Sequence, residues 1–484
     1  MAPPRQPEPK LNRAGHQRAL SAAAELADRL GIADRLEARK ENLWDPSAAN
    51  LPTLQLDDVS GIPFLSDIAG VEEYQHRGRL RAGTGDLYVT VTPAAAGYED
   101  YCRDQLNLGS PESLVADGSS APLAVAEACG RGDTFDQLVD HAKKSGGLVI
   151  HPYMGIEPVW NLAQKLSEAA SGTIKVLAPP PEVTWIANDK MLLSELVTKT
   201  VGEENVVETI VTHTASELAT RLKELAERHQ KVALKRLRTA SAMGNTVFEG
   251  ATVKATAPEE FENLITMELS RMQWDEIEPI LAVSWEETDC SPSTQWWIPS
   301  RGEGLPRLDG IYEQLLEGES KVFLGSKPSS LPWLVEEALV AQSYPVVIAL
   351  QELGYVGRCS FDHLVLGDLD GEFSLKVTEC NGRWGGTSTP MSLVDRLIPG
   401  SRPPYRAQDY VDDRLVGTTF PELCGQLGET LFDAKTGLGS LILYNVGPLE
   451  RDGKFDVIAL GSTQEEAEEV LLSKLPQLLG LVGS

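Results

Sequence analysis

The sequence predicts a multidomain protein of mixed α/β class, and three observations support this. At 484 residues the chain is longer than one compact domain usually is, so about three domains are expected. Segments that suit strands alternate with helical segments between residues 51 and 182. Beyond residue 182 the composition changes, and strands joined by short polar turns predict antiparallel sheets there.

The composition is that of a globular protein, with 42% hydrophobic and 24% charged residues. A formal net charge of −28 argues against a nucleic-acid-binding protein, because phosphates would be repelled over most of the surface. The charge permits a cationic substrate, although an acidic surface that aids solubility is the simpler interpretation. Six scattered cysteines without a CxxC pair indicate reduced thiols. With no apolar leader and no stretch near the ~20 apolar residues of a membrane span, we expect a cytoplasmic protein without a membrane partner.

The first third of the chain is expected to hold a polar tail, a helical segment and an α/β domain. Residues 1–12 are rich in proline and charge, and residues 18–43 have helical spacing with Gly31 as a break. Strand patterns follow at 85–93, 146–155 and 173–185. Because helical segments lie between these strands, we expect an N-terminal α/β domain over 51–182.

The middle of the chain predicts two helices and then three strands. The first helix covers 188–202 and starts near Asn188 or Asp189. The second covers 212–230, where Thr214 and Glu217 fit a capping box. Strands are expected over 231–237, 277–287 and 293–299, with a small-residue, hydroxyl-rich loop over 238–248.

The last third predicts a helix, a hairpin and a strand-turn-strand-helix tail. The helix covers 332–354 and is expected to break at Pro345. Strands over 355–367 and 373–381 are joined by the turn "DLDG". In the tail, Ser462 and Glu465 fit a capping box at the final helix.

The stretch "VTECNGRWGGTSTP" (377–390) carries the strongest functional signal. Side chains alternate along a strand, so Glu379, Asn381 and Arg383 are expected on one face. Asp362 lies on the preceding strand of the hairpin and could join them. Hard oxygen ligands without His or Cys suit Mg²⁺. Ordinary polar residues at a strand end are the alternative interpretation.

Two lysines and an acid-led strand add to this signal. Lys235 lies in the apolar strand "KVALKRL" and needs a partner, which could be a phosphate or an ordinary salt bridge. Lys190 lies at the start of a helix. The small residues after Lys235 would let backbone N–H groups approach phosphate oxygens, although the chain has no Walker A motif. Glu278 opens "EPILAV", which could hold an adenine ring or be a core strand.

In this order the motifs resemble the ATP-grasp superfamily, through "NDK", "VALKRLRTASAMGN", "EPIL", "GYVGRCSFD" and "ECNGRWGGTS". The resemblance covers about 183–400. The pattern E-x-N-x-R-x-GGT and the segment "GKFDVIALGSTQEEAEEVL" look most like the pheganomycin-type peptide ligases. This resemblance implies a pre-ATP-grasp α/β domain, followed by a two-lobed ATP-grasp fold with antiparallel sheets. It implies an N-terminal tail and helix over 1–50, the pre-ATP-grasp domain over 51–182, a lid subdomain over 183–255, a large subdomain over 256–400 and a C-terminal segment over 401–484.

The resemblance also implies a role for each matching residue. Mg²⁺ would be held by Asp362, Glu379 and Asn381, with Asp362 standing where many members carry a glutamate. Arg383 would face the γ-phosphate or the acyl phosphate as a catalytic residue. Glu286 and Glu287 are both candidates for the ribose contact. The residues expected around ATP are Lys190, Lys235, Ser241, Gly244, Asn245, Glu278, Pro279, Leu281 and Glu286.

The function that this resemblance implies is ADP-forming ligation of a carboxylate to an amine through an acyl phosphate, as in amide or peptide bond formation. The expected cofactors are ATP and Mg²⁺, and the expected partners are a small-molecule carboxylate and an amine or peptide, with a homodimer left open. Two alternatives remain: another ATP-grasp reaction, such as thiol ligation or phosphoryl transfer, and a non-catalytic ATP-binding regulatory protein. Trp296 and Trp297 could line a substrate pocket, but in a strand one of them would belong to the core.

Overall fold

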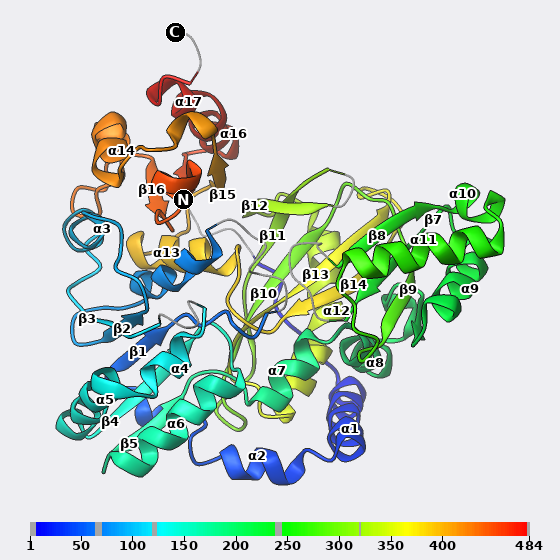
Figure 1. The fold of residues 1–484 in the computed structure, drawn as a ribbon, viewed down its shortest axis with the longest axis horizontal. Coiled ribbons are helices and arrows are strands. Elements are labelled where there is room, and N and C mark those ends of the chain that lie inside the picture. Colours follow the sequence, from blue (N-terminus) through cyan, green and yellow to red (C-terminus); the bar gives the residue numbers. More distant parts are fainter. Residues whose placement is uncertain (1–5, 63–69, 119–122, 238–243, 319–320, 482–484) are drawn as a thin grey trace.

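The computed structural model describes residues 6–62, 70–118, 123–237, 244–318 and 321–481. Three sheets organise this part of the chain (Figure 1). A parallel sheet carries the N-terminal region, a small antiparallel sheet lies at the opposite side of the molecule, and a long antiparallel sheet runs through the centre. The mixed α/β class predicted from the sequence is confirmed.

The N-terminal sheet is fully parallel and has the strand order β3-β2-β1-β4-β5. Its central strands are almost wholly buried, as expected where helices cover both faces. The alternation of strands and helices predicted for 51–182 is therefore present. The strands are β1 (Thr53–Leu56), β2 (Leu87–Thr90), β3 (Glu112–Val115), β4 (Gly147–Pro152) and β5 (Thr173–Val176), and the helices are α4 (Val125–Cys129), α5 (Gly132–Ser145) and α6 (Glu157–Ala169).

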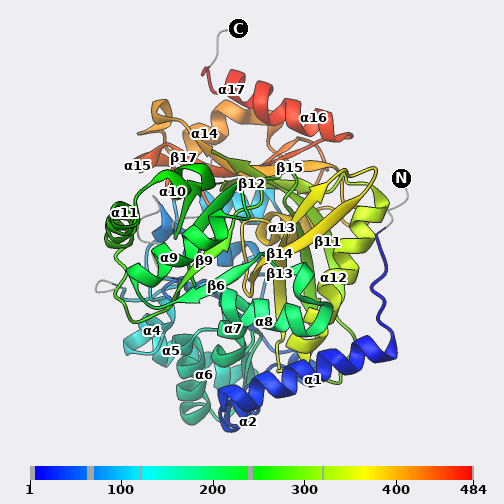
Figure 2. The same cartoon turned by 90° about the vertical axis from the view of Figure 1, so that its right-hand side faces the viewer.

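The small sheet is antiparallel, with the order β6-β9-β7-β8, and faces the viewer in Figure 2. Its strands are β6 (Thr209–Thr212), β7 (Lys231–Arg236), β8 (Asn245–Glu249) and β9 (Ile280–Ser284). It shares a core with α9 (Ala215–Ala226), α10 (Gly250–Ala255) and α11 (Pro258–Arg271). The loop predicted over 238–248 is partly wrong, because its last residues form β8 and Asn245 pairs with Lys235. Residues 238–243 lie outside the described part of the chain.

The central sheet has eight strands, in the order β14-β13-β10-β11-β12-β15-β17-β16. The first five belong to the middle of the chain: β10 (Pro292–Ile298), β11 (Arg307–Glu317), β12 (Val322–Pro328), β13 (Gly357–Gly367) and β14 (Phe373–Asn381). The last three come from the C-terminal segment: β15 (Tyr405–Val411), β16 (Leu441–Tyr444) and β17 (Lys454–Leu460). Since β12 pairs with β15, the C-terminal segment continues the same sheet.

The helix α12 (Trp333–Glu352) packs against α1 (Arg13–Leu30) and α8 (Lys190–Val201). It runs without interruption through Pro345, so the predicted break there is wrong. The helix residues before and after Pro345 are buried, and this packing compensates for the one backbone hydrogen bond that the proline cannot donate. Within the described residues α12 is the one helix long and apolar enough to cross a membrane, but 67% of its apolar window is buried inside the protein.

The helix caps differ slightly from the predicted ones. Thr214 accepts a hydrogen bond from the backbone N–H of Glu217, as predicted, but the Glu217 carboxylate bonds the N–H of His213 instead of completing the box. At α16 (Gln464–Glu469) the cap lies one residue later than predicted. Thr463 caps the helix there by accepting from the N–H of Glu466. At the first helix the backbone N–H groups of His213 and Thr214 are adjacent, and at the second the hydroxyl groups of Ser462 and Thr463 are adjacent. The sequence pattern therefore could not show which of the two neighbours makes the capping hydrogen bond.

Candidate active site

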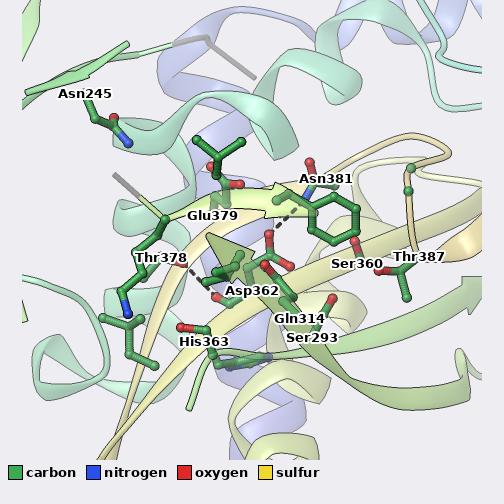
Figure 3. A pocket seen from close by; sticks show the side chains of 18 of the residues that line it. Asn245, Ser293, Gln314, Ser360, Asp362, His363, Thr378, Glu379, Asn381 and Thr387 are labelled. Atoms are coloured by element: carbon green, nitrogen blue, oxygen red, sulfur yellow. Dashed lines mark hydrogen bonds between the residues drawn. The ribbon is translucent and has the colours of Figure 1, made fainter. Parts of the chain in front are cut away.

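One cavity of about 550 Å³ lies where the small sheet, the central sheet and the N-terminal domain meet (Figure 3). Its lining includes eight of the residues singled out from the sequence. They are Lys190, Lys235, Asn245, Glu286, Asp362, Glu379, Asn381 and Arg383. These residues are spread over positions 190 to 383 of the sequence, and the fold brings them to the same cavity.

The β13–β14 hairpin sets the three expected metal ligands. Asp362 and Glu379 are direct cross-strand partners, so their side chains share a face. The register shifts just after Asp362, which marks a bulge at this point of the hairpin. The Asn381 Nδ2 atom donates to Asp362 Oδ2 at 3.0 Å, and the three side chains converge in Figure 3.

The two carboxylates have opposite electrostatic surroundings. Burial, followed by the neighbouring charge of Glu379, raises the pKa of Asp362 to about 7. Burial also acts against ionised Glu379, but Lys190, Arg383 and Lys235 outweigh it and lower the pKa of Glu379. Lys190 Nζ lies 3.6 Å from Glu379 Oε2. The pair therefore holds one firmly ionised carboxylate beside one that lacks a compensating cation.

This donor set fits a Mg²⁺ ion. Two carboxylates and an amide oxygen are hard oxygen ligands, and the raised pKa of Asp362 shows negative charge that a cation would offset. Among the described residues no group of three or more His, Cys, Asp or Glu side chains could hold a metal. A metal at Asp362 and Glu379 would therefore need the Asn381 amide and further oxygens from water or from a ligand.

Lys235 projects into the cavity from the strand β7, whose flanking residues Leu234 and Arg236 are buried. Its ammonium group lies 5.0 Å from the centroid of the Trp285 ring, a cation–π contact. Burial, and then the positive charge of Lys190, lowers the pKa of Lys235 to about 8. The two ammonium groups repel each other in this buried site, and an anionic ligand between them would offset that repulsion.

Arg383 is held by a residue of the helix α7 (Pro181–Asn188). Its Nη1 atom donates to Asn188 Oδ1 at 3.1 Å, and the Gly382 N–H donates to the same oxygen at 3.2 Å. Asn188 thus fixes the backbone and the side chain just after β14. The sequence placed Asn188 only at a helix start, because nothing local shows its partner 195 residues away.

Some of the residues expected around ATP are not part of the cavity lining. Glu278, Pro279 and Leu281 do not line the cavity. Glu278 Oε1 accepts from Arg236 Nε at 2.8 Å, and Leu281 is buried in the core. Gly244 also lies off the cavity lining, with its carbonyl accepting from the Arg236 N–H. Ser241 lies outside the described residues.

The segment directly after β9 lines the cavity in their place. Ser284, Trp285, Glu286 and Thr288 all contribute to the lining. Between the two candidates for the ribose contact, Glu286 lines the cavity. The Glu287 carboxylate is instead paired with Lys231 at 2.6 Å. The strand predicted over 277–287 is present as β9, and the cavity is lined by residues at its end and not by those at its start.

Several lining residues had no signal in the sequence. Gln314 and Phe323 lie on β11 and β12, which local patterns did not reveal. Trp296 and Trp297 are absent from the lining. Trp296 is fully buried and stacks on Tyr344, which supports the core interpretation. Ser293 also lines the cavity, as do Ser360 and Thr387, which lie in the quoted motifs but were assigned no role of their own.

Solved structures share this architecture. The carboxyaminoimidazole ribonucleotide synthase of Aspergillus clavatus, solved with ATP, aligns with a TM-score of 0.53 at 12% identity, over 90% of this chain and 100% of that chain. The N5-carboxyaminoimidazole synthetase of Staphylococcus aureus, solved with ADP, has a TM-score of 0.51 at 11% identity, over 90% and 98%. The biotin carboxylase domain of the Hydrogenobacter thermophilus 2-oxoglutarate carboxylase, solved with MgADP, ADP and bicarbonate, has a TM-score of 0.53 at 13% identity, over 89% and 93%.

In comparisons of sequence, no protein-family model and no curated protein matches the chain. At these identities the structural likeness shows the fold. It extends over about 90% of the chain. The chain therefore has the ATP-grasp fold that its motifs predicted.

Proposed function

We propose that this protein is an ADP-forming ligase that activates a carboxylate with ATP and joins it to an amine. One observation carries the proposal. One cavity collects the cations Lys190, Lys235 and Arg383 and the oxygen ligands Asp362, Glu379 and Asn381. The related fold in enzymes solved with ATP, ADP or MgADP supports the choice of nucleotide.

The charges of the site match the demands of this chemistry. A carboxylate and a triphosphate are both anionic, so bringing them together requires compensating positive charge. Lys190 and Lys235 would bind phosphate oxygens, and Arg383 would face the γ-phosphate. A Mg²⁺ ion held by Asp362, Glu379 and Asn381 would supply further charge compensation on the phosphates.

The nucleotide base would lie against the segment after β9. We place the adenine beside Ser284 and Trp285, and we assign the ribose contact to Glu286, because these residues line the cavity and Glu278 does not. Asn245 on β8 is the cross-strand partner of Lys235, so it would approach the phosphates from the same small sheet. Residues of the small sheet and of the central sheet would thus hold ATP from two sides.

The proposed reaction has two steps. A carboxylate oxygen of the first substrate attacks the γ-phosphorus, the bond to the β-phosphate oxygen breaks, and ADP leaves. The amine of the second substrate then attacks the acyl carbon, the bond from that carbon to the phosphate oxygen breaks, and phosphate leaves while the amine proton passes to it or to solvent. The acyl phosphate hydrolyses readily, so closure of the small sheet over the site is expected to keep water out.

The closer assignment rests on the sequence pattern E-x-N-x-R-x-GGT, which resembles the pheganomycin-type peptide ligases. On that basis we propose an amino acid or peptide amine as acceptor, a peptide bond as product and natural-product biosynthesis as the setting. All six cysteines are free thiols, which suits the cytoplasmic location expected for a consumer of ATP. The subdomain boundaries that we propose are the ones this resemblance implies, with the lid subdomain over 183–255 and the large subdomain over 256–400.

Nucleotide product analysis tests the proposal. The protein is incubated with Mg²⁺-ATP and pools of amino acids and peptides, and ADP, AMP and new amide masses are measured. ADP and phosphate that form only when a carboxylate and an amine are both present are the expected result. AMP and pyrophosphate would mean adenylation and would overturn it. ATP binding without turnover in any pool would favour a regulatory ATP-binding protein.

A further inference from the structure

The cavity has a second group of charged lining residues, which the proposed ATP chemistry does not use. Tyr74 and Arg77 come from the helical turns η3 (Val71–Leu80) of the N-terminal domain. Asp409 comes from β15 and Lys454 from β17, both in the C-terminal segment. These four residues line the same cavity as Asp362 and Glu379. We refer to them as the junction cluster.

The C-terminal strands set the spacing of the cluster. Lys454 and Asp456 are two residues apart on β17, so their side chains share a face. Asp409 on β15 is the direct cross-strand partner of Asp456. Two acids directly opposite each other repel, and they are stable here because each has its own cation. Lys454 Nζ lies 2.7 Å from Asp409 Oδ2, and Arg77 Nη2 lies 2.7 Å from Asp456 Oδ2.

Asp456 serves as the support of the cluster. It is fully buried and also accepts a hydrogen bond from Asn445 Nδ2 at 3.0 Å. Arg77 lies over the Tyr74 ring, with 3.7 Å between the guanidinium carbon and the ring centroid. This side chain is itself only 6% exposed, and among the described residues its Nε atom has no hydrogen-bond partner. Arg77 as a residue lines the cavity, so Asp456 and Tyr74 hold its guanidinium group beside the space that a ligand would occupy.

The charges of the cluster indicate what kind of ligand it would hold. Lys454 is paired with Asp409 within the cluster, and Arg77 is paired with the buried Asp456 behind it. Both signs reach the cavity, since Arg77, Lys454 and the half-buried Asp409 all line it. A purely anionic ligand would be repelled by Asp409, and a purely cationic ligand would be repelled by Arg77 and Lys454. A ligand with one charge of each sign satisfies both.

We propose that Arg77, Lys454 and Asp409 bind the carboxylate and ammonium groups of a free α-amino acid substrate. The carboxylate would lie against Arg77 and Lys454, and the ammonium group against Asp409. Tyr74 and Tyr153 would form the wall beside the Cα atom. This inference rests on the proposed ligase function and names the substrate class of the same cavity. The C-terminal segment then completes the substrate site.

Ligand-observed NMR, by saturation transfer from the full-length protein to a pool of the free amino acids, tests this site without turnover. We expect transfer to at least one amino acid and none to its N-acetyl or C-amide derivative, because each derivative lacks one charge. Lys454→Met and Asp409→Asn should each weaken the binding roughly tenfold or more. Lys327→Met is the matched control, because Lys327 forms a similar ion pair with Glu468 at 3.0 Å outside the cavity.

The outcomes separate the two proposals. Amino acid binding without any ADP formation would reject the ligase and keep the site. ADP formation with unchanged KM for the amino acid in both variants would keep the ligase and overturn the site. Equal binding of the derivatives, or no binding at all by a wild-type protein that unfolds cooperatively, would reduce the junction cluster to a structural ion-pair network. Unchanged melting temperatures of the variants would show that a loss of binding is not a loss of fold.

Discussion

Glu379 is the residue whose removal tests the site most directly. Replacing its carboxylate by an amide in Glu379→Gln keeps the shape but removes the charge that Lys190, Arg383 and Lys235 surround. We expect kcat to fall by about 100-fold or more, because charge placed for the transition state is lost. ADP release at saturating Mg²⁺-ATP measures this.

Glu372→Gln serves as the control, since Glu372 lies exposed at the turn of the same hairpin. Its activity and metal dependence should match the wild type. Near-wild-type turnover of Glu379→Gln with unchanged Mg²⁺ dependence would remove Glu379 from the proposed metal site.

Lys235 predicts a pH dependence of ATP binding. Its pKa is lowered to about 8 by burial and by Lys190, so the empty site loses this positive charge as the pH rises through 8. Only the ammonium form attracts a phosphate, so affinity for ATP should be full below that pH and fall above it. Between pH 7 and pH 9 the fall should be about tenfold.

Calorimetric titration with ATP across this pH range gives the measurement. Lys235→Arg, which stays charged, should flatten the profile, whereas Lys231→Gln on the same strand should leave it unchanged because Lys231 pairs with Glu249 and Glu287 away from the cavity. A wild-type affinity that is constant from pH 7 to pH 9 would contradict the assignment of Lys235 to phosphate.

At the scale of elements, the turn between β14 and α13 (Ser388–Leu397) depends on close packing. A Cβ atom on Gly386 would lie 2.5 Å from Phe323, a cavity residue on β12. Gly386→Ala should therefore displace Phe323 or the turn and lower kcat/KM about tenfold to a hundredfold. Gly385→Ala is the matched neighbour, because its Cβ atom would meet only Ser388 Oγ at 4.0 Å. Equal kinetics of the two variants would show that this turn tolerates added volume.

The elements also show how far sequence patterns reach. The β13–β14 hairpin was predicted closely, because a polar turn and two flanking strands are local signals. The strands β11, β12 and β15 were missed, although they carry Gln314, Phe323 and Asp409 to the cavity. Their place in the sheet depends on pairing partners far along the chain.

The site was predicted on the same terms. Residues in compact motifs, such as Glu379, Asn381 and Lys235, line the cavity as expected. Glu278 is expected near ATP because it opens an apolar strand and matches the ATP-grasp pattern, yet its side chain accepts a hydrogen bond from Arg236, 42 residues away. An acid at a strand end looks the same in sequence whether it meets a ligand or a salt-bridge partner.

At the scale of the molecule, the N-terminal domain contacts the turn that follows β14. Trp384 follows Arg383 and contacts two guanidinium groups, with Arg81 at 4.5 Å and Arg358 at 4.9 Å from its ring centroid. Its indole N–H donates to His151 Nε2 at 3.3 Å. Burial and the two arginines hold the pKa of His151 well below its usual range, so the ring stays neutral and can accept this bond. Asp57 in turn neutralises Arg81.

The C-terminal segment and the N-terminal domain share one hydrophobic core, and this predicts how the protein unfolds. Phe455 and Leu443 pack in the same buried cluster as Leu80 and Tyr98. Phe455→Ala should cost about 3–5 kcal/mol and lower the melting temperature of the whole chain as a single transition. Leu472→Ala, at an exposed position of the same segment, should leave it unchanged. Calorimetry that resolves a separate early transition in Phe455→Ala would instead show that the C-terminal segment unfolds on its own, and a substrate site built across that junction would then have to form on binding.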